Sequence, residues 1–325
     1  MENFTATAQA HPNIAFIKYW GNRDDYLRLP LNGSISMNLE DLVTKTTVVM
    51  DESLSEDILF INEQPVLGDS LSRVQNFMNI IRVRSEKKIY TSISSYNNFP
   101  AGAGIASSAA AFAALCVAAC RVFDLPLDFN DLSRLARRGS GSACRSIPGG
   151  FSEWLVGTSD HDSYAISIAP PNHWALIDIV AIVEDQPKKV GSSEGHKISS
   201  SSIIQDCRLA DAPRRLDICR NAILQKDFEK LAIISELDSN LMHAVMITST
   251  PPLFYWSPTT IFLMKYIQEM RKKGTPVFYT VDAGPNVHVI TEIGYKDEVS
   301  AALSSLPGVE YILSSRVGGP ARLIS

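Results

Sequence analysis

The sequence predicts an α+β protein of two lobes, with residues 1–185 in the N-terminal lobe and residues 186–325 in the C-terminal lobe. Short β-branched runs separated by turn residues fill residues 4–50, whereas apolar residues recur at helical spacing through residues 199–275. Between them, residues 184–196 are polar and rich in glycine, which is typical of a mobile loop and of a boundary between lobes. A chain of 325 residues with 45% hydrophobic content can build a substantial core.

The N-terminal elements follow from apolar periodicity and turn signals. Strands of an antiparallel sheet are expected near residues 4–11, 13–20, 32–38 and 44–50, and a hairpin arm at 58–65. Leu71, Val74, Phe77, Met78 and Ile81 predict a helix over 70–84, with Arg73 on its polar side. A strand at 88–95 and helices at 109–120 and 128–138 follow, the last with an Asx-type cap near its start.

The C-terminal half is predicted to be mostly helical around a few strands. A β-type apolar run covers residues 174–183, and helices are expected at 211–224, 227–246 and 258–273. Residues 280–290 have the pattern of two strands joined by a tight turn, with Asp282 at the turn. The tail is predicted to form a helix at 299–306 and a strand at 308–313.

A strand, a small-residue loop and a helix follow one another around residues 98–110. A helix N-terminus has unpaired N–H groups and a partial positive charge, so it binds phosphate well. Gly102 and Gly104 permit close backbone approach, and Ser107 and Ser108 add hydroxyls for phosphate or for Mg²⁺. The stretch lacks the Lys of a Gly-x4-Gly-Lys-Ser/Thr loop and the third glycine of a dinucleotide fingerprint. A glycine turn before a buried alanine-rich helix is the alternative interpretation.

Three further features carry charge. Residues 139–154 are dense in Gly and Ser and contain Arg145, which predicts a shaped anion-binding loop; a surface turn with an incidental arginine is the alternative. Lys18 stands in an apolar strand, and its position alone favours a surface residue over a buried cation held for an anion. Asp282 is placed where a carboxylate can face a cleft. A carboxylate, cations and a phosphate-binding loop together suit phosphoryl transfer to a hydroxyl.

Composition excludes several classes of protein. A net charge of −5 and a pI near 5.7 argue against a general nucleic-acid binder. Five cysteines without CxxC spacing indicate reduced thiols in a cytoplasmic protein, and Cys116 and Cys120 have the spacing of small core residues. We expect no signal peptide and no membrane span, because the longest mostly apolar stretch, residues 109–119, is too short to cross a bilayer.

Four long motifs occur in the order of one known family. They are His-Pro-Asn-Ile-Ala-Phe-Ile-Lys-Tyr-Trp-Gly-Asn-Arg-Asp at 11–24, Asn-Asn-Phe-Pro-Ala-Gly-Ala-Gly-Ile-Ala-Ser-Ser-Ala-Ala at 97–110, Arg-Gly-Ser-Gly-Ser-Ala-Cys-Arg-Ser at 138–146 and Asp-Ala-Gly-Pro-Asn at 282–286. Together they resemble the mevalonate diphosphate decarboxylases, members of the superfamily of galactokinase, homoserine kinase, mevalonate kinase and phosphomevalonate kinase. Residues 238–243 and 251–255 are further matches, so the resemblance spreads over nearly the whole chain.

This resemblance implies a fold, a reaction and two cofactors. The expected fold is that of the small-molecule kinases, with a mixed N-terminal sheet, a ferredoxin-like C-terminal lobe and the active site in the cleft between them. The expected reaction is ATP-dependent and Mg²⁺-dependent decarboxylation of a phosphorylated mevalonate in isoprenoid synthesis. ATP phosphorylates the C3 hydroxyl, phosphate departs, and the C1 carboxylate leaves as CO₂. The family also suggests a homodimer with a small-molecule substrate.

The resemblance assigns roles to residues that lie far apart in the sequence, and we expect Lys18, Arg145 and Asp282 to converge. Asp282 matches the base that takes or orients the C3 hydroxyl proton, and Lys18 matches the lysine beside it. Arg145 matches the arginine that holds the substrate carboxylate. The remaining matches are Tyr19, Asn22, Arg73, Ser140 and Ser142 for substrate; Ala103, Gly104, Ala106, Ser107 and Ser108 for nucleotide, with Ser108 also for Mg²⁺; and Ser192 and Ser193 for the loop that closes over ATP.

Three positions depart from the family pattern. Asn22 stands where the family usually has a lysine that faces the substrate phosphates, which makes a 5-monophosphate substrate an alternative to the 5-diphosphate. Residues 101–103 and Pro148 also differ, the latter with no functional interpretation. A kinase that stops at the 3-phosphorylated product is a third hypothesis, opposed by the joint presence of Lys18, Arg145 and Asp282. A non-catalytic ATP-binding regulator is the fourth.

Overall fold

The computed structural model describes residues 4–100, 107–126, 128–184 and 191–325. The N-terminal half is built on a mixed sheet in the order β16-β1-β6-β9-β7-β8. All neighbouring strands in it are antiparallel except β7 and β9, which are parallel because the chain crosses back through a helix between them. The strands are β1 (Thr5–Ala10), β6 (Thr44–Met50), β7 (Ile58–Ile61), β8 (Gln64–Pro65), β9 (Thr91–Asn97) and β16 (Arg322–Leu323).

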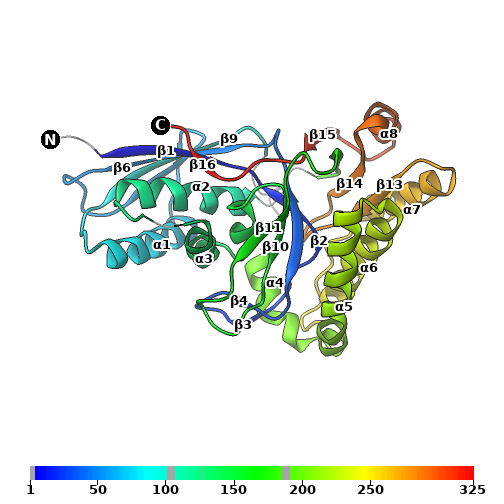
Figure 1. Ribbon diagram of the computed structural model, residues 1–325, viewed down its shortest axis with the longest axis horizontal. Coiled ribbons are helices and arrows are strands. Elements are labelled where there is room, and N and C mark those ends of the chain that lie inside the picture. The colour runs from blue at the N-terminus through cyan, green and yellow to red at the C-terminus, as the bar shows by residue number, and fades with distance from the viewer. Residues whose placement is uncertain (1–3, 101–106, 127, 185–190) are drawn as a thin grey trace.

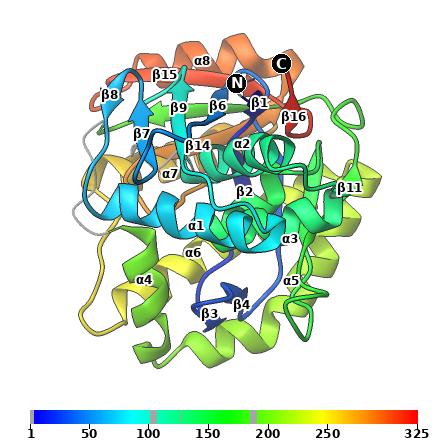
Figure 2. The same ribbon diagram turned by 90° about the vertical axis from the view of Figure 1, so that its left-hand side faces the viewer.

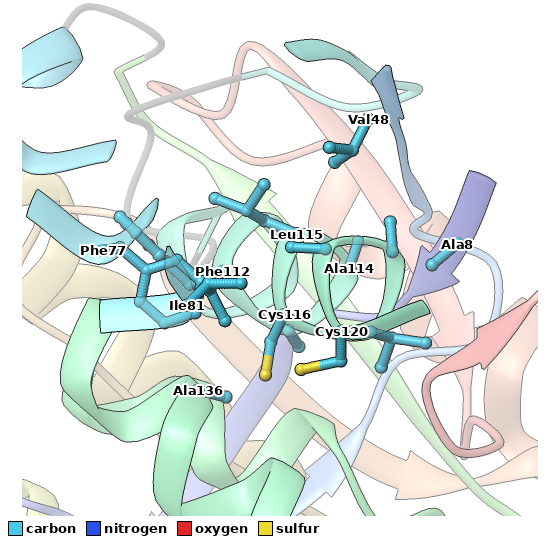
Figure 3. Close-up of a cluster of buried hydrophobic side chains, with 14 of the residues drawn as sticks. Ala8, Val48, Phe77, Ile81, Phe112, Ala114, Leu115, Cys116, Cys120 and Ala136 are labelled. Carbon is cyan, nitrogen blue, oxygen red and sulfur yellow. The ribbon is translucent and has the colours of Figure 1, made fainter. Parts of the chain in front are cut away.

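Three helices cover one face of this sheet (Figure 1): α1 (Asp69–Ser85), α2 (Ser107–Val122) and α3 (Phe129–Gly139). α2 is buried along most of its length, because its alanines let the sheet and the neighbouring helices approach closely. Figure 3 shows Phe112 of α2 beside Phe77 of α1, while Cys116 and Cys120 lie on the side of α2 that faces α3. Both cysteines are buried and free, so the prediction that they are core residues is confirmed.

The first strands of the chain divide between two sheets, so the single antiparallel sheet expected for residues 4–50 is wrong. β1 and β6 belong to the sheet above, whereas a second sheet has the order β11-β10-β5-β2. His11 and Pro12 separate β1 from β2, and Pro12 cannot donate a ladder hydrogen bond. The second sheet comprises β2 (Asn13–Ile17), β5 (Ser34–Asn38), β10 (Phe151–Trp154) and β11 (Ala165–Ala169); β3 (Asn22–Asp24) and β4 (Leu29–Pro30) form a separate hairpin.

The C-terminal sheet has the order β13-β14-β12-β15 with every pair antiparallel. The chain runs strand, helices, two strands, helix, strand, which is the ferredoxin-like arrangement expected from the sequence. β12 lies in the middle of this sheet, although its residues precede residue 185, where the N-terminal lobe was predicted to end. The division of the lobes at residue 185 stays a prediction. The elements are β12 (Leu176–Ile182), α5 (Gln205–Gln225), α6 (Phe228–Ile247), α7 (Pro258–Lys272), β13 (Val277–Thr280), β14 (Val287–Glu292), α8 (Lys296–Ser304) and β15 (Tyr311–Arg316).

The segment expected to be a mobile loop is partly helical. Residues 185–190 lie outside the described ranges, but the following residues form α4 (Ser192–Ile198). Gly195 packs directly on Trp20, and the backbone N–H of Gly21 donates to Nδ1 of His196 at 2.9 Å. These contacts fix α4 against the loop after β2, which the local composition of the segment did not reveal.

Two smaller differences complete the comparison. β16 was not predicted, and it returns the end of the chain to pair with β1. α5 begins six residues earlier than expected and continues through Pro213. In the part of the chain that the structure describes, no helix is both long and apolar enough to cross a membrane.

Candidate active site

An ion pair between Lys18 and Asp282 lies where the two halves of the chain meet. Lys18 follows β2, and Asp282 occupies the turn between β13 and β14. Lys18 Nζ donates to Asp282 Oδ1 at 2.5 Å, and the lysine is only 2% exposed, whereas the aspartate keeps 25% of its side chain accessible. The surface position that its strand context favoured for Lys18 is therefore wrong, because packing from the C-terminal half covers this end of the strand.

A buried charge network holds the backbone of Lys18 in place. Asp238 of α6 accepts a hydrogen bond from the Lys18 N–H at 2.6 Å and another from Nε of Arg215 at 2.7 Å. Arg208 of α5 donates to the Lys18 carbonyl at 2.8 Å and lies 3.8 Å from Asp238. Asp211 also accepts from Arg215, so the two arginines face two carboxylates. Buried charges persist only when paired in this way.

The turn that carries Asp282 is fixed by two other residues of α6, Ser239 and His243. Ser239 Oγ accepts from the Val281 N–H at 3.0 Å and donates to the Val281 carbonyl at 3.2 Å. His243 Nε2 lies 3.3 Å from the same carbonyl, and its ring stacks on Trp256. Burial lowers the pKa of His243 to about 3, so the neutral ring donates through Nε2. α6 therefore positions both members of the ion pair.

The electrostatics of the pair keep Asp282 ionised. Burial alone would raise the pKa of Asp282, but Lys18, His288 and Arg145 together bring it below its usual value of 3.8. Burial lowers the pKa of Lys18 below 10.5 despite the attraction of Asp282. At neutral pH the site holds a partly accessible carboxylate beside a cation, an arrangement able to orient a hydroxyl group and accept its proton.

Arg145 lies in the same region with its charge unpaired. It sits in a 3₁₀ helix (Gly141–Ser146), is 3% exposed, and acts electrostatically on both Lys18 and Asp282. Its nitrogens donate to Asn13 Oδ1 at 3.0 and 3.2 Å, to Ser36 Oγ at 2.9 Å and to Ser34 Oγ at 2.5 Å. Among the described residues it forms no ion pair with a carboxylate. The Gly/Ser loop is therefore more than a surface turn, because it places a buried arginine among defined hydrogen-bond partners. The charge of Arg145 is available to a carboxylate ligand.

The other predicted substrate residues border this centre. Tyr19 follows Lys18, its hydroxyl donates to Asn22, and its ring lies against Gly141 between Ser140 and Ser142. Ser140 Oγ lies 3.1 Å from Ser108 Oγ, which links the Gly/Ser loop to the start of α2. The Arg73 guanidinium of α1 donates through Nε to the Gly139 carbonyl at 3.0 Å and is stacked 4.8 Å from the Phe112 ring centre.

The start of α2 supplies the features expected of a phosphate site. Ser107 and Ser108 form its first turn, and a pocket of about 240 Å³ lined mainly by apolar side chains opens beside them, between α1, α2 and β9. The predicted residues Ala103, Gly104 and Ala106 lie outside the described residues. No cluster of three His, Cys, Asp or Glu that could hold a metal is found in the described ranges. Hydroxyl and phosphate oxygens are ligands that Mg²⁺ accepts.

α4 approaches the site from the other side. The His196 ring stacks on Tyr19 with centroids 4.1 Å apart and lies 4.5 Å from the Trp20 ring. Ser192 begins the helix, while nothing is described of the Ser193 side chain. Figure 2 places α4 near the β3–β4 hairpin.

Comparison with known proteins assigns the chain to a family. Residues 10–165 match the family model of the diphosphomevalonate decarboxylase-like N-terminal domain, and residues 178–319 match that of the mevalonate 5-diphosphate decarboxylase C-terminal domain. The chain is 37% identical to a diphosphomevalonate decarboxylase of Candida albicans, over 99% of this chain and 95% of that one. The chain belongs to the diphosphomevalonate decarboxylase family.

Solved structures agree with this membership. The chain aligns with "MDDEF in complex with MVAPP, AMPPCP and Magnesium" at a TM-score of 0.94 and 37% identity, covering 99% of both chains. Mevalonate diphosphate decarboxylase from Staphylococcus aureus gives the same TM-score and identity, over 99% of this chain and 98% of that one. The decarboxylase fold expected from the motifs is confirmed.

Within this family fold, the structure adds residues that sequence reasoning did not assign. Asn13 was noted in the first motif without a role, and it binds Arg145 through its side-chain oxygen. Asp238 and His243 belong to a matching segment, but only the fold shows that they hold Lys18 and the Asp282 turn. Arg208 gave no signal, because a lone arginine on a helix ordinarily faces solvent.

Proposed function

We propose that this chain catalyses the ATP-dependent decarboxylation of mevalonate 5-diphosphate to isopentenyl diphosphate, ADP, phosphate and CO₂. The observation that carries the proposal is the Lys18–Asp282 ion pair together with the guanidinium of Arg145, for which the described residues provide no carboxylate partner. A base for a hydroxyl and an arginine for a carboxylate are the two groups that a 3-hydroxy acid requires. The family membership supplies the reaction that uses both.

Each charged residue has one role in this reaction. Asp282 orients the C3 hydroxyl and accepts its proton as the phosphoryl group is transferred. Lys18 keeps Asp282 ionised and holds it in place. Arg145 binds the C1 carboxylate until the C1–C2 bond breaks; the electron pair of that bond forms the C2–C3 double bond as phosphate leaves C3.

ATP and Mg²⁺ fit the residues at the start of α2. ATP supplies the phosphoryl group, and Mg²⁺ neutralises charge on its phosphates. Ser107 and Ser108 offer hydroxyls at the helix N-terminus, and Ser108 is the residue that we assign to the metal ion. Ser140, linked to Ser108 by a hydrogen bond, joins the nucleotide side to the substrate side. Ser142, Ser192 and Ser193 complete the proposed contacts with substrate and ATP.

Product analysis with ATP and Mg²⁺ tests this function. Mevalonate, its 5-phosphate and its 5-diphosphate are offered separately, and release of ADP and CO₂ is followed for each. Equal amounts of both products from the diphosphate alone support the proposal. ADP without CO₂ would identify a kinase, and ATP binding without either product would favour a regulator.

A second candidate substrate is the 5-monophosphate, because of the surroundings of Asn22. Its amide donates to the Asp25 carboxylate at 2.8 Å, so this position presents a neutral group tied to an acidic one. A diphosphate adds negative charge that such a pair does not attract. ADP and CO₂ released from the 5-phosphate alone would establish this substrate and exclude the first.

Three further properties are proposals: the first rests on the family resemblance, the second on the cysteine pattern and the third on the polar, glycine-bearing residues 184–196. We propose a homodimer, a cytoplasmic location and a division into lobes near residue 185. Sedimentation of the purified chain tests the first, microscopy of a tagged chain in its own cell tests the second, and limited proteolysis tests the third. A monomer at micromolar concentration would contradict the dimer.

A further inference from the structure

The β3–β4 hairpin carries two arginines with different surroundings. Arg23 is exposed, and its Nη2 donates to the Val156 carbonyl at 3.2 Å. Arg28 is half-buried, and its Nε donates to the Arg138 carbonyl at 3.1 Å. In Figure 2 the hairpin lies next to α1 and α3. Arg28 therefore faces the protein while Arg23 faces outward.

Arg73 of α1 is held in the same way as Arg28, by a hydrogen bond from Nε to a backbone carbonyl at the end of α3. The Arg73 Nε donates to the carbonyl of Gly139, the residue directly after the one that binds Arg28. Two guanidinium groups from different elements are thus held on consecutive carbonyls. Each anchoring bond uses Nε, and in the described part of the chain neither arginine has a carboxylate partner. The outer nitrogens of both groups are left for another acceptor.

Arg28 and Arg73 lie close enough for their like charges to repel each other. Burial and the like charge of Arg28 lower the pKa of Arg73 to about 10, so Arg73 stays protonated at neutral pH. The carbonyls at the end of α3 stabilise positive charge only partially. Arg28 also adopts φ = 51°, a left-handed conformation that is costly for a residue other than glycine. Arg28 therefore combines backbone strain with electrostatic repulsion from Arg73.

The two arginines adjoin the predicted substrate residues. Ser140 follows Gly139, and the Tyr19 hydroxyl is so close to Gly141 that an added Cβ there would lie 2.7 Å from it. The charge of Arg28 also acts on Tyr19. The pair consequently lies at the end of the site that contains Tyr19 and Ser140.

We propose that Arg28 joins Arg73, which the family resemblance already assigns to substrate, in a two-guanidinium site for the terminal phosphate group, with Arg28 a specificity-determining residue of this chain. Arg28 supplies the positive charge that Asn22 does not. The ligand class is a phosphomonoester or diphosphate. The assignment to substrate rests on the proposed function, whereas the anion site itself stands on the geometry.

Steady-state kinetics of Arg28→Gln test the assignment, with Arg23→Gln from the same hairpin as the matched control. Glutamine has the same backbone preference as arginine at φ = 51°, so the strain is unchanged. We expect KM for the phosphorylated substrate to rise at least 10-fold in Arg28→Gln, with kcat within 3-fold and KM for ATP unchanged, because binding is lost equally in ground and transition states. Arg23→Gln is expected to match the wild type. An equal rise in KM for ATP, or no change in either KM, would overturn the assignment.

Calorimetric titration with inorganic pyrophosphate and with inorganic phosphate separates this inference from the proposed function. We expect pyrophosphate to bind the wild type and Arg23→Gln alike and to bind Arg28→Gln at least 10-fold more weakly. That result without any decarboxylation would retain the anion site and remove the function. If Arg28→Gln does not fold, Arg28→Lys, which keeps the charge but not the fork of donors, replaces it, with an expected loss of 3-fold or more. Equal binding by a folded Arg28 variant and the wild type would overturn the anion site.

Discussion

Lys18 is a buried cation whose ammonium group pairs with one partly accessible carboxylate. Its side chain is 2% exposed and pairs with Asp282, while its backbone is fixed by Asp238 and Arg208. A buried charge of this kind destabilises the folded protein when it has no partner, because its desolvation is not compensated. The chemistry and the stability of the site are therefore coupled through the same two side chains.

Replacement of Asp282 by asparagine separates these two contributions. We expect Asp282→Asn to lower kcat by about 10²–10⁴-fold, the usual effect of losing a positioned base. It leaves Lys18 unpaired, so the free energy of unfolding falls by up to about 3–5 kcal/mol. The double variant Lys18→Met/Asp282→Asn is expected to regain stability but not activity. Denaturant titration with kinetics checks this, and a double variant as unstable as Asp282→Asn would contradict the coupling.

The pH dependence of turnover reports the same pair. The pKa of Asp282 lies below 3.8, so the stability that its ionisation contributes is present above pH 3.8 and is lost as the pH falls through the lowered value. In Lys18→Met the largest opposing cation is gone, and burial raises the pKa of Asp282. We expect the acid limb of the kcat profile to move to higher pH. Wild-type and Lys18→Met profiles with superimposable acid limbs would show that Lys18 does not tune Asp282.

At the scale of elements, α4 is held against the site by a very close contact. A Cβ added at Gly195 would lie 2.5 Å from the Trp20 ring, whereas one added at Gly191, just before the helix, would meet nothing within 4 Å. α4 also brings His196 onto Tyr19. The position of the helix therefore depends on the absence of a side chain at residue 195.

Gly195→Ala and Gly191→Ala form a matched pair that tests this dependence. Overpacking at residue 195 is expected to move α4 away from Trp20 and to reduce kcat/KM by the equivalent of about 1–3 kcal/mol, that is, roughly 5–150-fold. Gly191→Ala has an ordinary φ of −74° and should remain within 2-fold of wild type. The measurement is steady-state kinetics on both variants. Equal activities would show that the contact between α4 and Trp20 does not matter for turnover.

At the scale of the whole molecule, the two halves are joined by buried charges as well as by apolar packing. One apolar cluster includes Phe16 of β2 together with Phe278 of β13 and Leu231 of α6. Beside it, Asp238 connects α6 with the end of β2 and with Arg215 of α5. Removal of this carboxylate would leave two fully buried arginines with less compensation.

We expect Asp238→Asn to lower the free energy of unfolding by about 3–5 kcal/mol, since one partner of a buried charge network is lost. The matched control is Glu269→Gln on α7, which breaks an exposed pair with Lys272 and should change stability by less than about 1 kcal/mol. Urea titration followed by tryptophan fluorescence measures both. Similar small losses in the two variants would contradict a joining role for Asp238.

Local sequence patterns and the long motifs were enough to predict most element types, the ferredoxin-like order of the C-terminal half and the family. These follow from local periodicity, caps and long motifs, as with Asp128, which caps α3 by accepting from the Asp131 N–H as its position predicted. The turn position of Asp282 and the core position of Cys116 and Cys120 were also predictable. Each depends on neighbours close in the chain.

Contacts between side chains that are far apart in the sequence could not be predicted and became known from the three-dimensional structure. Strand context placed Lys18 at the surface, yet Asp282, 264 residues away, covers it. The split of the first strands between two sheets, the helix α4 and the pairing of β16 with β1 likewise depend on partners far along the chain. No sequence pattern singled out Arg28. Its proposed role depends on its hydrogen bond to the Arg138 carbonyl, which is next in the chain to the Gly139 carbonyl that binds Arg73. Burial and pairing are properties of the assembled fold, and local sequence patterns do not encode them.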